Sequence, residues 1–228
     1  MTGERETGDG GVGAERTGHE HVGPPAPAGW PVGWEGATES VVTTLGPNDR
    51  WNVAALGLFA PADPTTDPGD SGGPDARVTA RTWGRTRTWR NFRERGAGYV
   101  QFTRDPVDFV EAACTVREED EPVLPSADAW VHVTVDAVAE GAAGETEWVE
   151  WALSPVEASV ERRVVPTVDR AHAAVVEATV AASRLGVPGY EDARLRGRIE
   201  DCESVVDSCG GPRTREAWKR FEATLEDA

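Results

Sequence analysis

The hydrophobic period of the chain changes once, close to Pro166, and this change limits the fold more than any other feature of the sequence. Before it, β-branched and aromatic residues alternate with polar ones, as they do along half-buried strands. After it, apolar residues recur every three or four positions from Val168 to Leu185, which is the spacing of an amphipathic helix. Strands followed by helices predict an α+β protein in which an antiparallel β domain precedes a helical C-terminal unit.

The strand signals begin with a hairpin. Residues 39–45 are β-branched, turn-forming residues follow at 46–49, and residues 51–60 form a second apolar run. Further strands are expected at residues 77–83, 99–103, 130–138 and 148–165.

Two short helices interrupt these strands. Thr88 is a good N-cap for a helix over residues 89–95, which Gly96 would end. Asp105 and Pro106 start the second helix, since Asp is a favoured cap and Pro fits the first helical position. After Pro166, helices are expected at residues 168–185, 190–209 and 213–225.

These signals divide the chain into three parts. Residues 1–29 are rich in Gly, Glu, Thr and Pro and have almost nothing to bury, which predicts a disordered acidic tail. Residues 30–165 are expected to form the β domain, and residues 166–228 a helical C-terminal domain. Residues 61–76 are expected to form an acidic loop within the β domain.

The charge is strongly negative, with 40 acidic against 23 basic residues and a net charge of -17. Every basic residue is Arg except Lys219, and Ile199 is the only isoleucine. At molar salt the Debye length falls to about 3 Å, so a carboxylate-covered surface no longer repels itself. We interpret the composition as halophilic. A GC-rich genome also explains the scarcity of Lys, but not the excess of acids.

The charge and the apolar pattern exclude several partners. Phosphate backbones and anionic membranes need clustered, outward-facing cations, so neither nucleic acid nor a membrane is expected as the main partner. No apolar run approaches membrane-spanning length and the N-terminus lacks a signal-peptide pattern, so a cytoplasmic protein is expected. Cys114, Cys202 and Cys209 lack the C-x-x-C spacing of zinc sites, and we expect buried thiols and no metal.

Positive charge is concentrated in one segment of this acidic chain. Its arginines are Arg77, Arg81, Arg85, Arg87, Arg90, Arg93 and Arg95, with Glu94 as the only acid among them. Arg forks bind phosphate oxygens, the hydroxyls of Thr86 and Thr88 can donate, and free N–H groups at a helix start favour an anion. One interpretation is a site for a phosphate monoester. The other is pairing with the acidic surface, especially for Arg77, Arg81, Arg93 and Arg95.

Several segments follow one another in an order that is typical of one family. They are residues 39–44 (ESVVTT), 52–57 (NVAALG), 83–92 (WGRTRTWRNF) and 105–109 (DPVDF). In this order the chain resembles an archaeal domain-of-unknown-function family, number 447, of FMN-binding split-barrel proteins related to flavin reductases. The resemblance implies a six-stranded antiparallel split barrel that forms a homodimer, with FMN near the subunit interface.

The resemblance also implies which residues bind FMN. Thr43 and Thr44 would lie on the strand beside the flavin, and Asn52, Val53 and Ala54 along its isoalloxazine or ribityl part. The positions that match the family's phosphate-side segment are Arg85, Thr86, Thr88 and Asn91. The chemistry is suitable, because small Ala54 lets backbone amides approach a flat ring and Asn52 offers both a donor and an acceptor.

Functions of different classes are compatible with such a site. One is an FMN-dependent oxidoreductase, for example a flavin reductase with a nicotinamide donor. Another is a non-catalytic module that stores, carries or senses FMN. No acid/base constellation is visible, since His132 and His172 stand alone and His132 is expected to be structural, so no catalytic residue is assigned. A structural protein with a decayed flavin site is a third interpretation, which the intact Thr and Asn positions disfavour.

The composition generates a prediction about salt. Because screening removes the repulsion among the acidic residues, we expect the protein to lose compactness when it is diluted from molar KCl into low salt. Circular dichroism during thermal unfolding across a KCl series measures this. A thermal midpoint that does not depend on KCl would contradict the halophilic interpretation.

Overall fold

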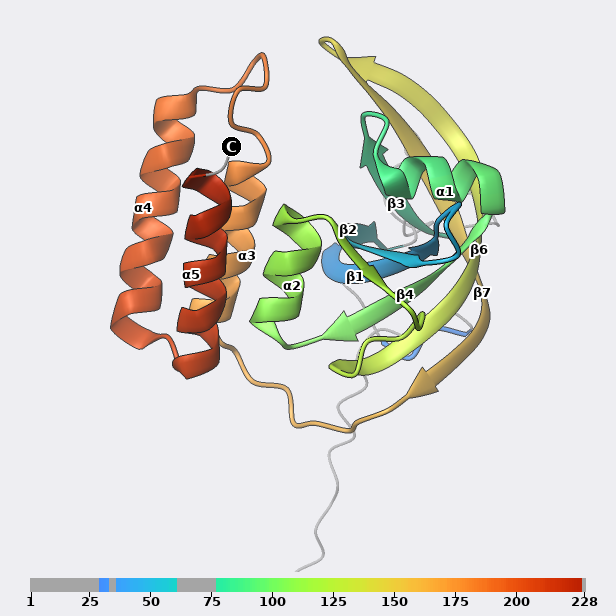
Figure 1. Ribbon diagram of the computed structural model, residues 1–228, viewed down its shortest axis with the longest axis horizontal. Helices are drawn as coiled ribbons and strands as arrows, with labels where there is room; N and C mark the ends of the chain where they lie inside the picture. The colour runs from blue at the N-terminus through green and yellow to red at the C-terminus, as the bar shows by residue number, and fades with distance from the viewer. Residues whose placement is uncertain (1–28, 33–35, 61–76, 227–228) are drawn as a thin grey trace, which may run out of the picture.

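The computed structural model describes residues 29–32, 36–60 and 77–226. Almost all of the expected tail, 1–29, and the whole of the expected acidic loop, 61–76, lie outside the described residues. The described chain forms an antiparallel β-barrel with helices packed along one side (Figure 1). The predicted fold class, an antiparallel split barrel followed by a helical unit, is confirmed.

Pairing between neighbouring strands closes the barrel. The strands are β1 (Ala37–Leu45), β2 (Trp51–Phe59), β3 (Val78–Trp83), β4 (Ala97–Thr103), β5 (Arg117–Glu119), β6 (Ala127–Ala143) and β7 (Thr146–Val160). Antiparallel pairing follows the order β1-β4-β6-β7-β3-β2, and the pairing of β2 with β1 completes the ring. Short β5 is added to β2 outside this ring. The ring is the six-stranded barrel that the family resemblance implies.

The barrel is open along part of β2. The ladder between β1 and β2 covers the full length of both strands. On its other edge, β2 pairs with β3 only at Leu58 and Phe59, and with β5 only at residues 51–53. Among the residues that the structure describes, residues 54–57 therefore have a ladder partner on one edge alone. Their remaining backbone groups are left to water, side chains or a ligand.

Alternate strand residues fill the barrel interior. The buried core includes Val42, Leu56, Leu58, Val78, Val100, Val131, Val133, Val149, Trp151 and Leu153. Helix α1 (Arg87–Arg95) packs across one end of the barrel, because Phe92 enters this core with its ring 5.4 Å from that of Trp151. Gly96, in the left-handed conformation at φ 63°, ends α1 as expected.

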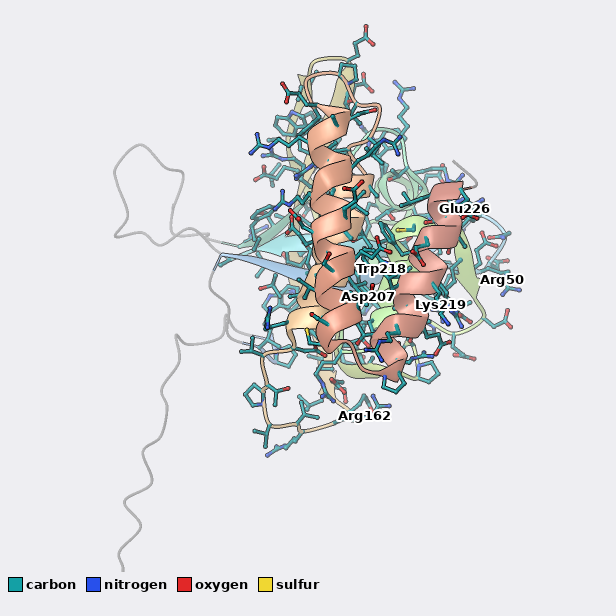
Figure 2. The ribbon with its side chains drawn as sticks, turned by 90° about the vertical axis from the view of Figure 1, so that its left-hand side faces the viewer. Arg50, Arg162, Asp207, Trp218, Lys219 and Glu226 are labelled. Atoms are coloured by element: carbon teal, nitrogen blue, oxygen red, sulfur yellow. The ribbon has the colours of Figure 1, made fainter. Side chains whose placement is uncertain are left out.

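The remaining helices form a second core beside the barrel. They are α2 (Pro106–Cys114), α3 (Arg170–Ala182), α4 (Asp192–Cys209) and α5 (Pro212–Glu226). Helix α2 lies between the barrel and the other helices, since Phe109 shares a small cluster with Val41 and Val53 on the outer face of the barrel while Val110 packs among α3, α4 and α5. Figure 2 shows Trp218 of this second core between α4 and α5. None of the described helices is long and apolar enough to cross a membrane.

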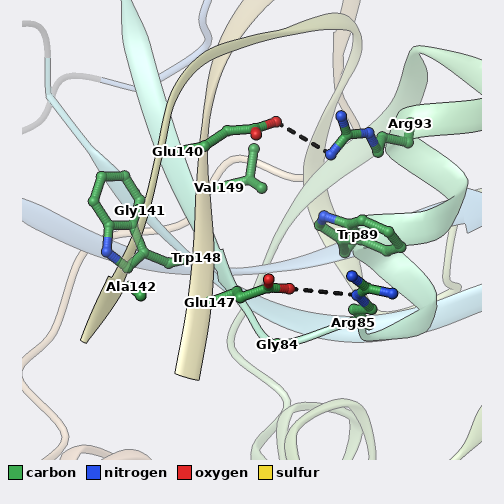
Figure 3. A pocket seen from close by; sticks show the side chains of 10 residues that line it. All are labelled: Gly84, Arg85, Trp89, Arg93, Glu140, Gly141, Ala142, Glu147, Trp148 and Val149. Atoms are coloured by element: carbon green, nitrogen blue, oxygen red, sulfur yellow. Dashed lines mark hydrogen bonds and ion pairs between the residues drawn. The ribbon is translucent and has the colours of Figure 1, made fainter. Parts of the chain in front are cut away.

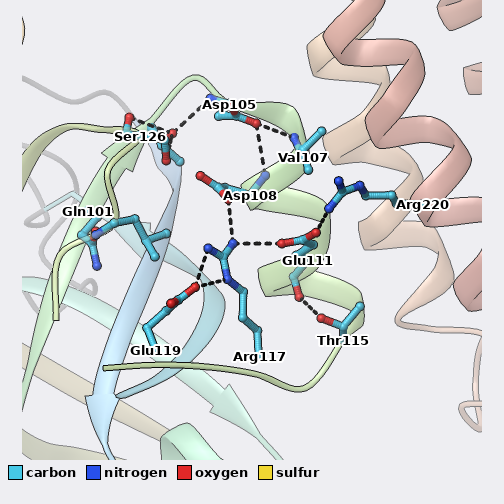
Figure 4. A network of polar contacts seen from close by, with 12 residues as sticks. Gln101, Asp105, Val107, Asp108, Glu111, Thr115, Arg117, Glu119, Ser126 and Arg220 are labelled. Carbon is cyan, nitrogen blue, oxygen red and sulfur yellow. Dashed lines mark hydrogen bonds and ion pairs between the residues drawn. The ribbon is translucent and has the colours of Figure 1, made fainter. Parts of the chain in front are cut away.

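A network of ion pairs ties β5 and α2 to α5 (Figure 4). Arg117 Nη1 of β5 contacts Asp108 Oδ1 at 2.6 Å and Glu111 Oε2 at 3.0 Å, both on α2. Glu111 also pairs with Arg220 of α5. At the start of α2, Asp105 accepts hydrogen bonds from two backbone N–H groups and pairs with Arg213 of α5 at 2.9 Å.

The start of α1 differs from the prediction that Thr88 is its N-cap. Thr86 is the cap, because its Oγ1 accepts a hydrogen bond from the Trp89 N–H at 3.2 Å. Thr88 lies within the helix and is buried. The earlier start has a physical reason, since it directs Thr88, Asn91 and Phe92, which are three and four residues apart, to the barrel.

Other boundaries also differ. The hairpin of β6 and β7 is longer than its alternating sequence indicates, because β6 continues to Ala143 and Gly144 turns the chain at φ 61°. Strand β7 ends at Val160, and residues 161–169 are exposed and lack regular structure. Cys202 is buried as expected, but Cys209 is exposed near the end of α4. Cys209 is the last residue of α4.

The contacts of Asp105 generate a prediction about acid stability. Burial would raise the pKa of Asp105, but hydrogen bonds from Arg213 and from backbone N–H groups outweigh it and lower the pKa. The carboxylate therefore stabilises the fold above its unfolded pKa of about 3.9, and this contribution is lost as the pH falls through the folded pKa. We expect Asp105→Asn, which keeps a capping oxygen, to lower Tm at pH 7 and to approach wild type at acidic pH.

A second variant separates the charge from the cap. Asp105→Ala should be less stable than Asp105→Asn by about 1 kcal/mol at every pH, because it also removes the cap. Thermal unfolding at one KCl concentration between pH 3 and 7 measures both effects. A constant difference between wild type and Asp105→Asn over this range would contradict the assignment.

Candidate functional site

The turn between β3 and α1 places polar side chains at the end of the barrel. After Trp83, Gly84 turns the chain at φ 68°, and Thr86 then caps the helix. The barrel-facing side of α1 meets the ends of β1 and β2 beside their turn. We call the polar residues that meet there the mouth cluster, which consists of Thr44, Asn52, Thr88 and Asn91.

The mouth cluster is buried, and hydrogen bonds join two of its members, Asn91 and Thr44. Thr44 and Asn91 have no exposed surface, and Asn52 and Thr88 each retain 5%. Asn91 Nδ2 donates to Thr44 Oγ1 at 3.0 Å. Thr44 lies opposite Asn52 in the β1–β2 ladder, so their side chains share one face of the barrel wall. The structure thus brings these predicted site residues together.

Asn52 is the carboxamide of the mouth cluster that has no bonded partner in the described part of the chain. Its carboxamide makes no hydrogen bond to another residue within the described ranges. In that part of the chain, Trp218 Nε1 is the only fully enclosed side-chain nitrogen or oxygen without a partner. The polar atoms of Asn52 therefore still reach solvent at the mouth. They offer a ligand both a donor and an acceptor, beside the unpaired stretch of β2.

Other predicted site residues lie elsewhere. Thr43 is on the opposite face of β1 from Thr44, and its Oγ1 accepts a hydrogen bond from Gln101 Nε2 at 3.1 Å. Val53 packs against Phe109 of α2, outside the barrel. Ala54 returns to the inner face and contacts the barrel core. Consecutive strand residues point to opposite faces, so the predicted strand residues cannot all contact one side of a ligand.

Most arginines of the basic segment pair with carboxylates. The ion pairs are Arg81–Glu150 at 2.5 Å, Arg85–Glu147 at 3.3 Å, Arg87–Glu118 at 2.8 Å and Arg93–Glu140 at 3.1 Å. Surface pairing is therefore confirmed for Arg81 and Arg93, and it also holds for Arg85, the arginine predicted to lie near a phosphate. The Arg85 side chain is 72% exposed. Such exposed pairs stabilise a protein by about 1 kcal/mol or less.

Arg90 belongs to the basic segment, but the sequence alone assigns it neither to a phosphate nor to a surface pair. It is half-buried, and its Nε and Nη2 both donate to Asn91 Oδ1 at 3.3 Å. No carboxylate pairs with it among the residues that the structure describes. In the sequence, the one sign that Arg90 could belong to the site is its position next to Asn91, a predicted site residue. Its lack of an acidic partner is visible only in the folded chain.

A hollow of about 510 Å³ lies on the other side of α1, against the β6–β7 hairpin (Figure 3). Trp89 forms one wall, and the pairs Arg85–Glu147 and Arg93–Glu140 cross its edges. The cations and carboxylates in this hollow neutralise one another, so it offers no net attraction for a phosphate. Thr86 and the mouth cluster do not line it.

The mouth cluster contains no side chain that titrates near neutral pH. His132 lies on the outer face, stacked on Tyr99 with ring centroids 4.6 Å apart, in the structural role expected of it. Burial lowers the pKa of His172 on α3. Burial and the neighbouring Glu177 raise the pKa of Glu39, which lies toward the other end of β1 from Thr44. The cluster can therefore hold and orient a ligand through neutral hydrogen-bonding groups, without proton transfer of its own.

Comparisons with known proteins agree with this fold. The structure is similar to the crystal structure of an FMN-bound protein from Methanosarcina mazei, with 23% identity and a TM-score of 0.67 over 84% of this chain and 96% of that chain. Lower similarity is found to nitrilotriacetate monooxygenase component B from Bacillus cereus, with 15% identity and a TM-score of 0.41 over 57% of this chain and 72% of that chain. The styrene monooxygenase flavin reductase from Pseudomonas putida S12 has 14% identity and a TM-score of 0.33, over 55% of this chain and 80% of that chain. No curated protein matches the chain.

Family models cover most of the described sequence. The model of the N-terminal domain of DUF447, a protein of unknown function, matches residues 38–162. The model of the C-terminal DUF447 domain matches residues 169–223. Residues 163–168, which separate the two matches, lie in the exposed connection between β7 and α3. The chain therefore belongs to the DUF447 family of proteins of unknown function.

Proposed function

We propose that the protein is an FMN-binding flavoprotein with a redox function, and that the flavin binds at the mouth of the barrel, between the open stretch of β2 and the first turn of α1. The observation that carries the proposal is Asn52, a buried carboxamide whose donor and acceptor are unused within the described chain. The similar protein from Methanosarcina mazei is FMN-bound, which supports the choice of ligand.

The residues at the mouth suit the two ends of FMN. An isoalloxazine ring presents donors and acceptors along one edge, which the Asn52 carboxamide and the unpaired backbone of residues 54–57 can meet. A phosphate suits the start of α1, where the N–H groups of Arg87 and Thr88 have no carbonyl one turn earlier in the helix. The Thr86 hydroxyl accepts a bond there and can still donate one.

The other members of the predicted site have supporting roles in this proposal. Thr44 and Asn91 bind each other and fix the wall beside Asn52. Thr43 and Val53 hold β1 and β2 from the outer face. Arg85 would have to exchange Glu147 for a phosphate oxygen. The homodimer and the nicotinamide donor implied by the family resemblance also belong to the proposal, as does the division into a barrel domain and a helical domain.

FMN supplies an isoalloxazine ring that takes up and returns two electrons. The chain's own contribution is binding and orientation, since the mouth cluster has no acid or base. This same neutrality favours a second candidate, a non-catalytic module that stores, carries or senses FMN.

The first experiment is direct. Protein purified in molar KCl should be yellow and should release a flavin that chromatographs as FMN. Added FMN should bind the flavin-free protein with quenching of flavin fluorescence. If FMN at micromolar concentration does not bind the folded, salt-stabilised protein, the proposed function is wrong.

Two amide variants locate the site. Asn52→Ala should weaken FMN and riboflavin equally, by about tenfold, through the loss of one or two hydrogen bonds of about 1 kcal/mol each. It should not lower Tm, because Asn52 has no described partner to lose. The matched control, Asn91→Ala, should lower Tm, because it leaves Thr44 without its donor. Unchanged flavin affinity of Asn52→Ala would exclude the mouth as the ring site.

A turnover assay separates the oxidoreductase from the carrier module. We expect the protein to oxidise NADH or NADPH, with free FMN or FAD as acceptor, faster than the same mixture without protein. A rate equal to that blank for a protein that binds FMN would favour the module.

A further inference from the structure

Arg90 is a cation without a counter-charge in a protein with a large excess of acids. Four neighbouring arginines pair with carboxylates, namely Arg81 with Glu150, Arg85 with Glu147, Arg87 with Glu118 and Arg93 with Glu140. Arg95, also on α1, has no carboxylate partner in the described structure, but it is exposed and donates to the Gly46 carbonyl oxygen at 3.5 Å. Arg90 instead donates twice to the neutral oxygen of Asn91. Glu94 lies one turn later on the same helix, yet no ion pair joins it to Arg90 in the described structure.

The lack of a partner is unfavourable at this position. Arg90 is half-buried, so part of its hydration is lost without a carboxylate to replace it. The net charge of -17 would make a partner easy to supply. An arginine that has no carboxylate partner, and whose guanidinium is oriented by a carboxamide, is suited to bind the anionic group of a ligand.

The contacts of Arg90 connect it to the mouth cluster. Asn91 accepts from Arg90 through Oδ1 and donates to Thr44 through Nδ2, so one carboxamide links the guanidinium to the wall of the barrel. Thr44 is in turn opposite Asn52, the buried amide with free polar atoms. Two groups at the same end of the barrel thus have unused binding capacity in the described chain. Within it, Arg90 has no carboxylate partner, and the carboxamide of Asn52 has no hydrogen-bond partner.

We infer that Arg90 binds the phosphate group of the flavin and makes the site selective for phosphorylated flavins over riboflavin. This inference rests on the proposed FMN function and replaces Arg85 with Arg90 as the main phosphate ligand. A guanidinium held at Nε and Nη2 by Asn91 keeps its other N–H groups for phosphate oxygens. The N–H groups of the first turn of α1 add further donors for the same anion.

The test uses two arginines of one helix as a matched pair. Arg90→Gln and Arg93→Gln remove the same charge from α1, but Arg93 is paired with Glu140 at the hollow. FMN and riboflavin are titrated into each protein at one KCl concentration, and Tm is recorded. Arg90→Gln should weaken FMN binding about tenfold or more and leave riboflavin unchanged, whereas Arg93→Gln should leave both affinities unchanged. Arg90→Lys should lose part of the FMN affinity only, since it keeps the charge without the fork.

The possible outcomes distinguish a failure of the role of Arg90 from a failure of the proposed FMN function. If wild type binds FMN and Arg90→Gln binds it equally well, or loses FMN and riboflavin by the same factor, the role of Arg90 is overturned and the flavoprotein stands. If Arg90→Gln does not fold, the ratio of FMN to riboflavin affinity in Arg90→Lys decides, and an unchanged ratio overturns the role. A wild-type protein that binds neither flavin overturns both proposals.

Discussion

The full-length ladder between β1 and β2 is the interaction on which the rest of the structure depends. It is the pairing that closes the barrel, and it must hold β2 almost alone, because β3 and β5 reach only the two ends of that strand. The same asymmetry creates the candidate site. A strand secured along one edge can leave the middle of its other edge open, so the barrel keeps its shape although residues 54–57 have no ladder partner on that edge within the described chain.

Helices α2 and α5 support strand β2, which has an open edge. Phe109 of α2 packs with Val53 on the outer face of the barrel. The ion pairs of Arg117 connect β5, the short partner of β2, to α2. Helix α5 holds α2 in place through Asp105 and Glu111. Helix α2, held by α5, therefore supports β2 from the face opposite to the mouth cluster.

The sequence predicts the local elements well because their signals are local. The hairpin of β1 and β2, the cap of α2 at Asp105 and the end of α1 at Gly96 all follow from residues within a few positions. The prediction of Thr88 as the N-cap of α1 is wrong because Thr86 and Thr88 both qualify as caps, and only packing on the barrel decides between them. The sequence also indicates part of the arrangement at the candidate site. Asn91 bonds to Thr44, which lies opposite Asn52, but the partners of Thr43 and of the paired arginines come from distant segments that periodicity does not specify.

The distribution of arginines has a further consequence at the salt concentration that the composition suggests. Exposed pairs such as Arg85–Glu147 and Arg93–Glu140 are screened when the Debye length is about 3 Å, so they can add little to the placement of α1. The helix must then depend on buried contacts, namely Phe92 in the core and the hydrogen bond from Asn91 to Thr44. Half-buried Arg90 is screened less than its exposed neighbours. In a salt-rich solution it is therefore the arginine of α1 best able to keep its attraction for an anion.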